Sequence, residues 1–283
     1  MQNTKESDTK RQTVSILGCG WLGSPLAQYL LKKKYKVKGS TTSEEKLEEL
    51  ESAGVEPYKI RLEESIPVPT AFLDSDILVL NIPPGLRRNS LKTHLKQLES
   101  LFSSMQKDKP GKLLFVSSTS VYENKNREMT EADVNRDSDI YKIEEYVREE
   151  CLRRSNSLTI LRCGGLMGHD RIPCKYYSGK TNLTLANTPV NYIHRDDVIG
   201  IIHKILNLES WGQVFNAVSP EHPLRKDIID NCCQRTSFTK PTYAEEEKED
   251  FKIISSARLI EQLSYKFKYP NPLEYPYEES VKA

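Results

Sequence analysis

The segment TVSILGCGWLGSPLAQYL, residues 13–30, decides the fold that we expect for this chain. It begins with an apolar run typical of a buried strand and ends with leucines at helical spacing. The glycines between them follow the pattern G-x-G-x-x-G, which in this context indicates a loop that holds a pyrophosphate. Gly18 would make the tight turn, Gly20 would let the phosphates approach the backbone, and Gly23 would let helix and strand pack closely. The predicted dinucleotide contacts of this loop are Gly18, Gly20, Trp21, Leu22 and Gly23.

Strand-like and helix-like segments alternate along the rest of the chain. We expect strands over 36–40, 55–60, 75–84, 112–120, 158–165 and 213–219, and helices over 24–35, 43–54, 90–105, 135–150 and 196–206. This alternation predicts an α/β fold with a doubly wound, mostly parallel sheet of the Rossmann type. We expect a disordered tail over 1–12, the dinucleotide-binding core over 13–165, and a small C-terminal substrate lobe over 166–283, interleaved with the last strands of the core.

Charge and cysteine content exclude several function classes. The chain of 283 residues carries 41 Lys plus Arg and 40 Asp plus Glu, a balance that gives no support for nucleic-acid or membrane binding. Its six cysteines lack the spacing of paired metal ligands, so we expect no metal site. No secretion signal is seen, which predicts reduced thiols and a cytoplasmic protein. The expected partner is a small-molecule substrate, and a homodimer is left open.

The end of the second strand bears on which dinucleotide binds. An Asp or Glu about 20 residues beyond the glycines usually bonds a free ribose 2′-hydroxyl. Here the chain reads GSTT at residues 39–42, so no carboxylate would repel a 2′-phosphate. The hydroxyls of Ser40, Thr41 and Thr42 would donate to that phosphate, which favours NADP over NAD. The same residues would also cap the next helix, and both roles can hold together.

Four motifs occur in the order of a known superfamily. They are GCGWLG at 18–23, LFVSSTSVY at 114–122, LRCGGLMG at 161–168 and YIHRDDVIGII at 192–202. With them the chain resembles the extended and atypical short-chain dehydrogenase/reductase superfamily, whose members are often described as NAD-dependent epimerase/dehydratase-like. The resemblance implies a nicotinamide cofactor and a Rossmann fold, and it does not name a substrate.

The resemblance also implies roles for single residues. Ser118, at the end of the fifth strand, would hold the reacting oxygen of the substrate. Arg171 and Lys180 lie in the substrate-side loop and would bind an anionic group, although such cations are often simply solvated. His194 and Asp197 match a family signature that often only anchors a loop and the start of a helix. The further cofactor contacts implied are Asn81, Ile82, Pro83, Pro84, Ser117, Cys163 and Gly164.

The chain departs from the superfamily at its catalytic signature, Tyr-x-x-x-Lys. If Tyr141 holds the tyrosine position, the lysine position is Glu145, and a carboxylate disfavours a phenolate nearby. If Lys142 holds the lysine position, the tyrosine position is Ser138. Tyr141 and Lys142 would act together only if the helix begins irregularly, and Tyr141 would equally serve as a packing residue.

Two interpretations therefore stay open. The first, which we favour, is an NAD(P)-dependent oxidoreductase or epimerase with Ser118, Tyr141 and Lys142 as its catalytic residues. The second is a non-catalytic NADP-binding protein that regulates a partner or senses redox state. The damaged Tyr-x-x-x-Lys pattern favours the second interpretation, whereas the retained serines of the fifth strand favour the first.

Overall fold

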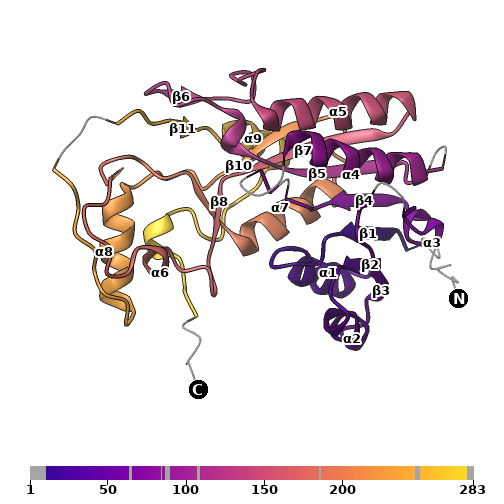
Figure 1. Cartoon of the computed structure of the whole chain (residues 1–283), viewed down its shortest axis with the longest axis horizontal. Coiled ribbons are helices and arrows are strands. Elements are labelled where there is room, and N and C mark those ends of the chain that lie inside the picture. Colours follow the sequence, from indigo (N-terminus) through magenta and orange to yellow (C-terminus); the bar gives the residue numbers. More distant parts are fainter. Residues whose placement is uncertain are drawn as a thin grey trace, which may run out of the picture. The chain divides into compact units, whose positions relative to one another are not determined.

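The described chain contains a sheet of seven parallel strands in this computed structural model (Figure 1). The structure describes residues 11–63, 66–83, 85–86, 90–106, 109–184, 186–245 and 249–278. Across the sheet the strand order is β10-β7-β5-β4-β1-β2-β3. The strands are β1 (Thr13–Leu17), β2 (Lys36–Thr41), β3 (Glu56–Lys59), β4 (Ile77–Leu80), β5 (Lys112–Ser118), β7 (Ser157–Cys163) and β10 (Val214–Ala217). This order confirms the predicted α/β fold of the Rossmann type.

The predicted helices are present and differ from the prediction only at their ends. The helices are α1 (Gly23–Lys32), α2 (Glu45–Ser52), α3 (Thr70–Leu73), α4 (Leu91–Ser104), α5 (Asp139–Arg153), α6 (Pro173–Tyr177), α7 (Arg195–Asn207), α8 (Arg225–Arg235) and α9 (Ala257–Leu263). In α1 the buried positions Leu26, Ala27 and Leu30 recur at helical spacing and form one apolar face. In β4 all four residues are buried, as expected for a parallel strand covered on both faces.

The chain divides into two compact units. The first comprises Met1–Leu114 and Glu149–Ser157, and the second comprises Phe115–Arg148 and Leu158–Ala283. Within the first unit, β1 pairs with β2 and with β4, and Val14 lies opposite both Val37 and Ile77. The glycine loop follows this central strand directly.

The second unit carries two short parallel strand pairs of its own. β8 (Gly165–Met167) pairs with β9 (Tyr192–His194), and β6 (Glu128–Met129) pairs with β11 (Ile253–Ile254). Two 3-10 turns, Thr119–Val121 and Pro272–Glu274, complete its regular elements in the described residues. The β6–β11 pair brings residues near 250 to the segment that follows β5.

The prediction of reduced thiols throughout is wrong for one pair of cysteines. Cys174 of α6 and Cys232 of α8 form a disulfide, with their Cα atoms 5.8 Å apart. Both belong to a buried cluster with Ile172 and Ile229, so packing of the two helices brings the thiols together. The 58-residue separation of the two cysteines gave no signal in the sequence.

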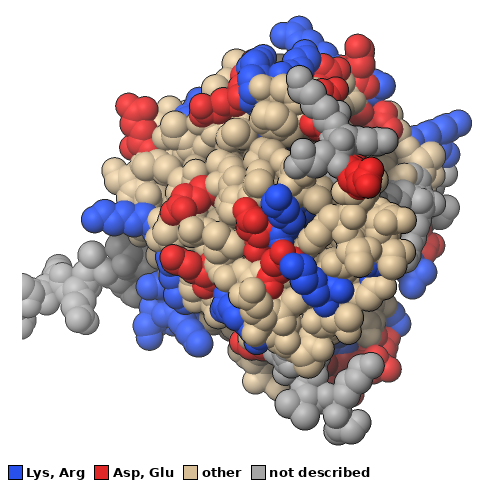
Figure 2. Space-filling view, turned by 90° about the vertical axis from the view of Figure 1, so that its left-hand side faces the viewer, with Lys and Arg blue, Asp and Glu red and all other residues tan. Residues whose placement is uncertain are grey.

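No helix in the described part of the chain is long and apolar enough to cross a membrane. On the face shown in Figure 2, basic and acidic side chains are interspersed, with uncharged surface between them. This mixture agrees with the formal net charge of +1.

Candidate functional site

The glycine loop in the first unit is fixed by hydrogen bonds from two neighbouring strands. The Gly18 amide donates to Ser40 Oγ at 2.9 Å, and the Cys19 amide donates to the Ser40 carbonyl at 2.7 Å. Asn81 Nδ2 donates to the Gly18 carbonyl at 2.9 Å. Gly18 has φ +105°, and a Cβ at Gly23 would overlap the Gly18 carbonyl oxygen. Gly18 and Gly23 therefore have the roles that the sequence predicted.

Gly20 is the point at which this loop is open. A Cβ built there meets no atom within 4 Å, so the backbone is accessible to a bound group. The loop leads into α1, whose first turn contains no acidic residue and whose N-terminus favours anions. Leu22 is buried and Trp21 is half-buried, so Leu22 would contribute its backbone to a cofactor contact. These residues fit the pyrophosphate of a dinucleotide.

The three hydroxyl groups that were predicted to contact the cofactor at the end of β2 differ in burial and in hydrogen bonding. Ser40 is only 2% exposed and its Oγ accepts from Gly18, so this hydroxyl shapes the loop. Thr41 is also buried, and its Oγ1 accepts from the Ser43 amide at 3.2 Å. Thr42 is exposed and is the one best placed to meet a ribose or its phosphate. The prediction that these residues cap the next helix is wrong, because the N-cap of α2 is Glu44 and no side chain caps that helix.

The segment after β4 contacts the glycine loop, and its contact with a cofactor stays a prediction. Asn81 holds the Gly18 carbonyl, and Ile82 Cγ2 lies 3.2 Å from the position that a Cβ of Gly18 would occupy. Pro83 is exposed, and Pro84 lies outside the described residues.

In the second unit, the serines at the end of β5 make local hydrogen bonds. Ser118 Oγ accepts from the Ser120 amide at 3.1 Å and caps the 3-10 turn Thr119–Val121. Ser117 Oγ donates to Glu144 Oε1 at 2.6 Å, which directs it into the protein interior and away from a cofactor role.

Glu144 belongs to a buried polar network that sequence reasoning missed. Its carboxylate pairs with Arg162, whose Nη2 lies 2.7 Å from Oε2, and the two side chains are at most 2% exposed. Arg162 Nη1 donates to the Tyr122 hydroxyl at 2.8 Å, and that hydroxyl donates to Asn216 Oδ1 at 2.6 Å. Burial raises the pKa of Tyr122 to about 12, with Arg162 opposing the shift. Tyr122 is therefore a neutral, structural phenol.

The regular α5 helix does not bring Lys142 to the side of Tyr141 on which a catalytic lysine is expected. Tyr141 is half-buried against the cluster around Val121 and Tyr122, and its hydroxyl has no partner among the described residues. Lys142 is about half exposed and pairs with Asp139 one turn earlier. Glu145 stands at the lysine position and accepts from Arg148 Nε at 2.8 Å. The regular helix thus places a carboxylate, Glu145, and not a cation four residues after Tyr141.

The loop after β7 is shaped by close backbone contacts. A Cβ at Gly164 would overlap the Asn191 carbonyl oxygen, which also accepts from the Gly165 amide at 2.8 Å. Cys163 is buried, and burial raises the pKa of its thiol to about 12, so it is no nucleophile. Of the predicted substrate cations, Arg171 is half-buried, with its pKa lowered by burial, whereas Lys180 is exposed with its Nζ 5.8 Å from the Tyr177 ring centre.

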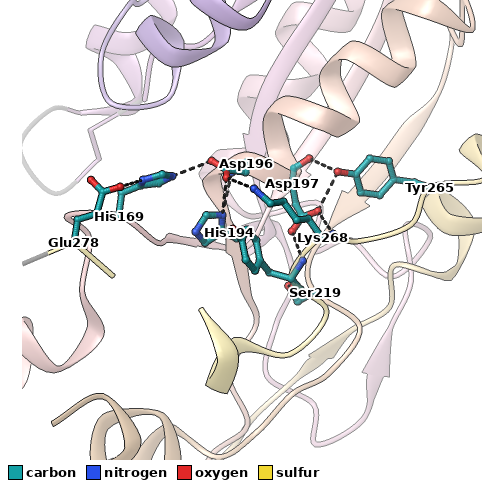
Figure 3. A network of polar contacts seen from close by, with 9 residues as sticks. His169, His194, Asp196, Asp197, Ser219, Tyr265, Lys268 and Glu278 are labelled. Atoms are coloured by element: carbon teal, nitrogen blue, oxygen red, sulfur yellow. Dashed lines mark hydrogen bonds and ion pairs between the residues drawn. The ribbon is translucent and has the colours of Figure 1, made fainter. Parts of the chain in front are cut away.

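The HRDD motif of residues 194–197 anchors the C-terminal segment (Figure 3). Asp197 is buried, and its carboxylate accepts from the Lys268 amide at 2.7 Å, the Tyr269 amide at 3.0 Å and the Tyr265 hydroxyl at 3.0 Å. His194 Nδ1 accepts from the Asp196 amide at 3.2 Å and caps α7. These bonds support the structural role considered for this motif.

His169, His194 and Asp196 also lie close enough to surround a cation. However, the Nδ1 atom of His194 already accepts a backbone hydrogen bond, which leaves its proton on Nε2 and makes that nitrogen a poor ligand. Asp196 faces the Lys268 ammonium at 3.1 Å, and His169 lies between Asp196 and Glu278 at 2.9 Å from each. We assign the cluster to the same structural anchor.

Comparisons with known proteins agree with this geometry. The NAD(P)H-binding family model matches residues 18–209. Protein YeeZ of Escherichia coli K12 is 28% identical over 275 residues, covering 94% of this chain and 99% of YeeZ.

Solved structures extend the comparison to the fold. The UDP-glucose 4-epimerase of Thermotoga maritima, solved with UDP-glucose, aligns at 16% identity with a TM-score of 0.70, over 90% of this chain and 94% of the epimerase. The UDP-glucuronic acid 4-epimerase of Bacillus cereus, solved with NAD, aligns at 18% identity with a TM-score of 0.71, over 93% and 97% of the two chains. These likenesses establish the fold and confirm the resemblance drawn from the motifs. The chain therefore belongs to the NAD(P)H-binding family, on the epimerase/dehydratase-like fold of the extended short-chain dehydrogenases.

Proposed function

We propose that this protein is an NADP(H)-dependent oxidoreductase or epimerase that acts on a hydroxyl group of a small polar substrate. The observation that carries the proposal is the open backbone at Gly20, in a loop that Ser40 and Asn81 hold in shape. A nicotinamide bound through this loop would accept or donate the hydride. Gly18 to Gly23 would hold its pyrophosphate through backbone amides and the N-terminus of α1.

The preference for NADP rests on the end of β2. Thr42 is exposed there, no carboxylate occupies residues 39–42, and Lys46 follows in the first turn of α2. A 2′-phosphate would therefore meet a hydroxyl and a cation rather than a repelling charge.

Two residues of the second unit support the proposal that the protein catalyses a reaction on its substrate. Ser118 stands at the carboxyl end of β5, where doubly wound folds bind their ligands, and Tyr141 presents a hydroxyl that is not committed elsewhere among the described residues. The sugar nucleotides bound or named in the two epimerase structures suggest the first substrates to try, since both have oxidisable ring hydroxyls.

The alternative is a non-catalytic NADP-binding protein, favoured by Glu145 at the lysine position. A turnover assay separates the two proposals, and a binding titration tests the cofactor site that they share. NADPH fluorescence titration should show saturable binding under both, whereas a panel of UDP-glucose, UDP-glucuronic acid and simpler polyols should produce reduced nicotinamide only under the first. Binding without turnover across a broad panel would favour the alternative, and loss of both would contradict the site itself.

A further inference from the structure

Arg162 of β7 lies at the centre of hydrogen bonds that fix the chain on both sides of Ser118. Its Nε donates to Glu144 Oε1 at 3.0 Å and its Nη2 to Oε2 at 2.7 Å, and the same Oε1 accepts from Ser117 Oγ at 2.6 Å. Its Nη1 donates to the hydroxyl of Tyr122 at 2.8 Å. Ser117 directly precedes Ser118, which is the N-cap of the 3-10 turn that Tyr122 ends. One guanidinium therefore serves both ends of this turn.

The same bonds join three elements that carry residues predicted for the site. Glu144 lies three residues after Tyr141 on α5, so the two share one turn of that helix. Through Ser117, the carboxylate of Glu144 fixes α5 against the end of β5. Arg162 stands on β7, two residues before Gly164, a predicted cofactor contact. The ion pair thus links β5, α5 and β7 at the ends where the candidate site residues stand.

Tyr122 is held at its backbone as well as at its hydroxyl. Its carbonyl accepts from Lys252 Nζ at 2.5 Å, and its hydroxyl donates to Asn216 Oδ1 at 2.6 Å. Arg162 Nη1 also donates to the Glu131 carbonyl at 3.0 Å. Tyr122, Arg162 and Asn216 are at most 3% exposed, so water does not compete for these bonds. The end of the turn therefore has little freedom to move.

A buried ion pair of this kind fixes geometry more than it adds stability. The cost of taking two charges out of water can exceed their attraction, and apolar side chains of similar volume often give equal stability. The bonds of a guanidinium to a carboxylate, by contrast, are directional and specify the placement of both partners. Burial opposes the charge of Arg162, but Glu144 outweighs it and raises the pKa of the guanidinium, so the pair stays ionised. Such a pair suits a site at which the position of a hydroxyl matters.

We propose that Glu144 and Arg162 are positioning residues of the reaction, which hold the turn carrying Ser118 against α5. The inference rests on the function proposed above. The two residues act through Ser117 and Tyr122, so neither has to touch the substrate. When one of those hydroxyls is removed, Ser118 should remain in place on average but occupy a wider range of positions. Misplacement of a positioned group by about 1 Å can lower turnover by up to about 100-fold.

The first test measures the turn without any substrate. Hydrogen exchange, followed by mass spectrometry of peptides that contain residues 118–122, reports how often the turn opens. Tyr122→Phe removes the hydroxyl and keeps the ring, and it should speed exchange in these peptides by at least about tenfold. Tyr275→Phe is the matched control, because it removes another buried phenol hydroxyl of the same unit, which bonds Ser219 at 2.6 Å. Exchange in residues 118–122 that rises equally in the two variants, or in neither, would overturn the proposal.

The second test uses the substrate that turnover identifies. Ser117→Ala should lower kcat about tenfold, while KM and the Kd of NADPH each change less than about threefold. Ser117→Thr should keep kcat within about threefold of the wild type, because a threonine hydroxyl can make the same bond. Once Ser118 is already alanine, adding Ser117→Ala should lower kcat less than about twofold further, since the first residue acts through the second. Tyr275→Phe should leave kcat unchanged.

The results of the two tests separate this proposal from the proposed function. Full turnover in Ser117→Ala, or effects of Ser117→Ala and Ser118→Ala that simply multiply, would contradict the positioning role. NADPH binding without turnover in the wild type would count against the proposed function itself, and the exchange measurement would still show whether Arg162 and its partners hold the turn.

Discussion

Replacing Gly20 with Val is the sharpest perturbation of the phosphate loop. A Cβ at this position meets no atom within 4 Å, and Gly20 does not require the left-handed conformation. The protein alone therefore has room for the new side chain. We expect the free energy of unfolding to change by no more than about 0.5 kcal/mol, as for other exposed substitutions.

Dinucleotide binding should respond very differently to the same change. The added methyl groups occupy the space through which the pyrophosphate reaches the backbone. Displacing the phosphates would forfeit at least two hydrogen bonds to a charged group, each contributing about 1.5–3 kcal/mol. Affinity should fall by at least about 100-fold, equivalent to roughly 2.7 kcal/mol.

NADPH fluorescence titration and urea unfolding measure the two effects on one preparation. Gly23→Ala provides the contrast, because its Cβ would overlap the Gly18 carbonyl oxygen and should damage both the fold and binding. If Gly20→Val binds NADPH as tightly as the wild type, the loop does not hold the pyrophosphate and the site is misassigned.

Four further predictions follow from single side chains. Thr42→Asp should weaken NADPH about tenfold and strengthen NADH, because its carboxylate repels a 2′-phosphate and bonds a free hydroxyl; paired titrations with unchanged preference would refute this role. Tyr141→Phe should lower kcat less than about tenfold if another group moves the proton, whereas Ser118→Ala should lower it about 10- to 100-fold; the reverse order in steady-state kinetics would return the acid–base role to Tyr141. Glu144→Gln should cost about 3–5 kcal/mol in urea unfolding, because a buried guanidinium loses its counterion, and a cost below about 1 kcal/mol would contradict that pairing. Burial lowers the pKa of His194 to about 4, so near pH 4.5 the unfolded chain binds a proton that the native state does not bind. The free energy of unfolding should therefore fall by about 2.5 kcal/mol between pH 7 and 4.5 because of this residue. His194→Asn should remove that part of the decrease when urea unfolding is compared at the two pH values.

The fold and the phosphate loop could be predicted because their signals are local. Gly18 and Gly23 are required by turn geometry and close packing. This requirement can be recognised from the short glycine motif and the segments on either side of it in the sequence. The apolar runs of β1 and β4 likewise indicate strands that are covered on both faces.

The features that were missed depend on residues far apart in the chain. Glu144 and Arg162 are charged residues at buried positions, and each looks like a surface residue until its partner is known. The disulfide joins cysteines 58 residues apart through the packing of α6 against α8. Lys252 reaches the Tyr122 carbonyl across 130 residues, within a polar segment that has no motif. Ser40 was placed at the right strand end, but its burial against Gly18 could be seen only in three dimensions.

Transfer of a hydride at this site is the central claim, and bound reduced nicotinamide reports it most directly. The protein, saturated with NADP or NAD, is mixed with each sugar nucleotide and polyol of the panel while absorbance and fluorescence of the reduced ring are followed. Because an epimerase regenerates its cofactor, the bound signal is read in the first turnover as well as at steady state. We predict that at least one substrate produces the reduced ring and that Ser118→Ala slows its appearance about 10- to 100-fold. If the wild type binds the dinucleotide but no substrate yields the reduced ring, the claim is contradicted.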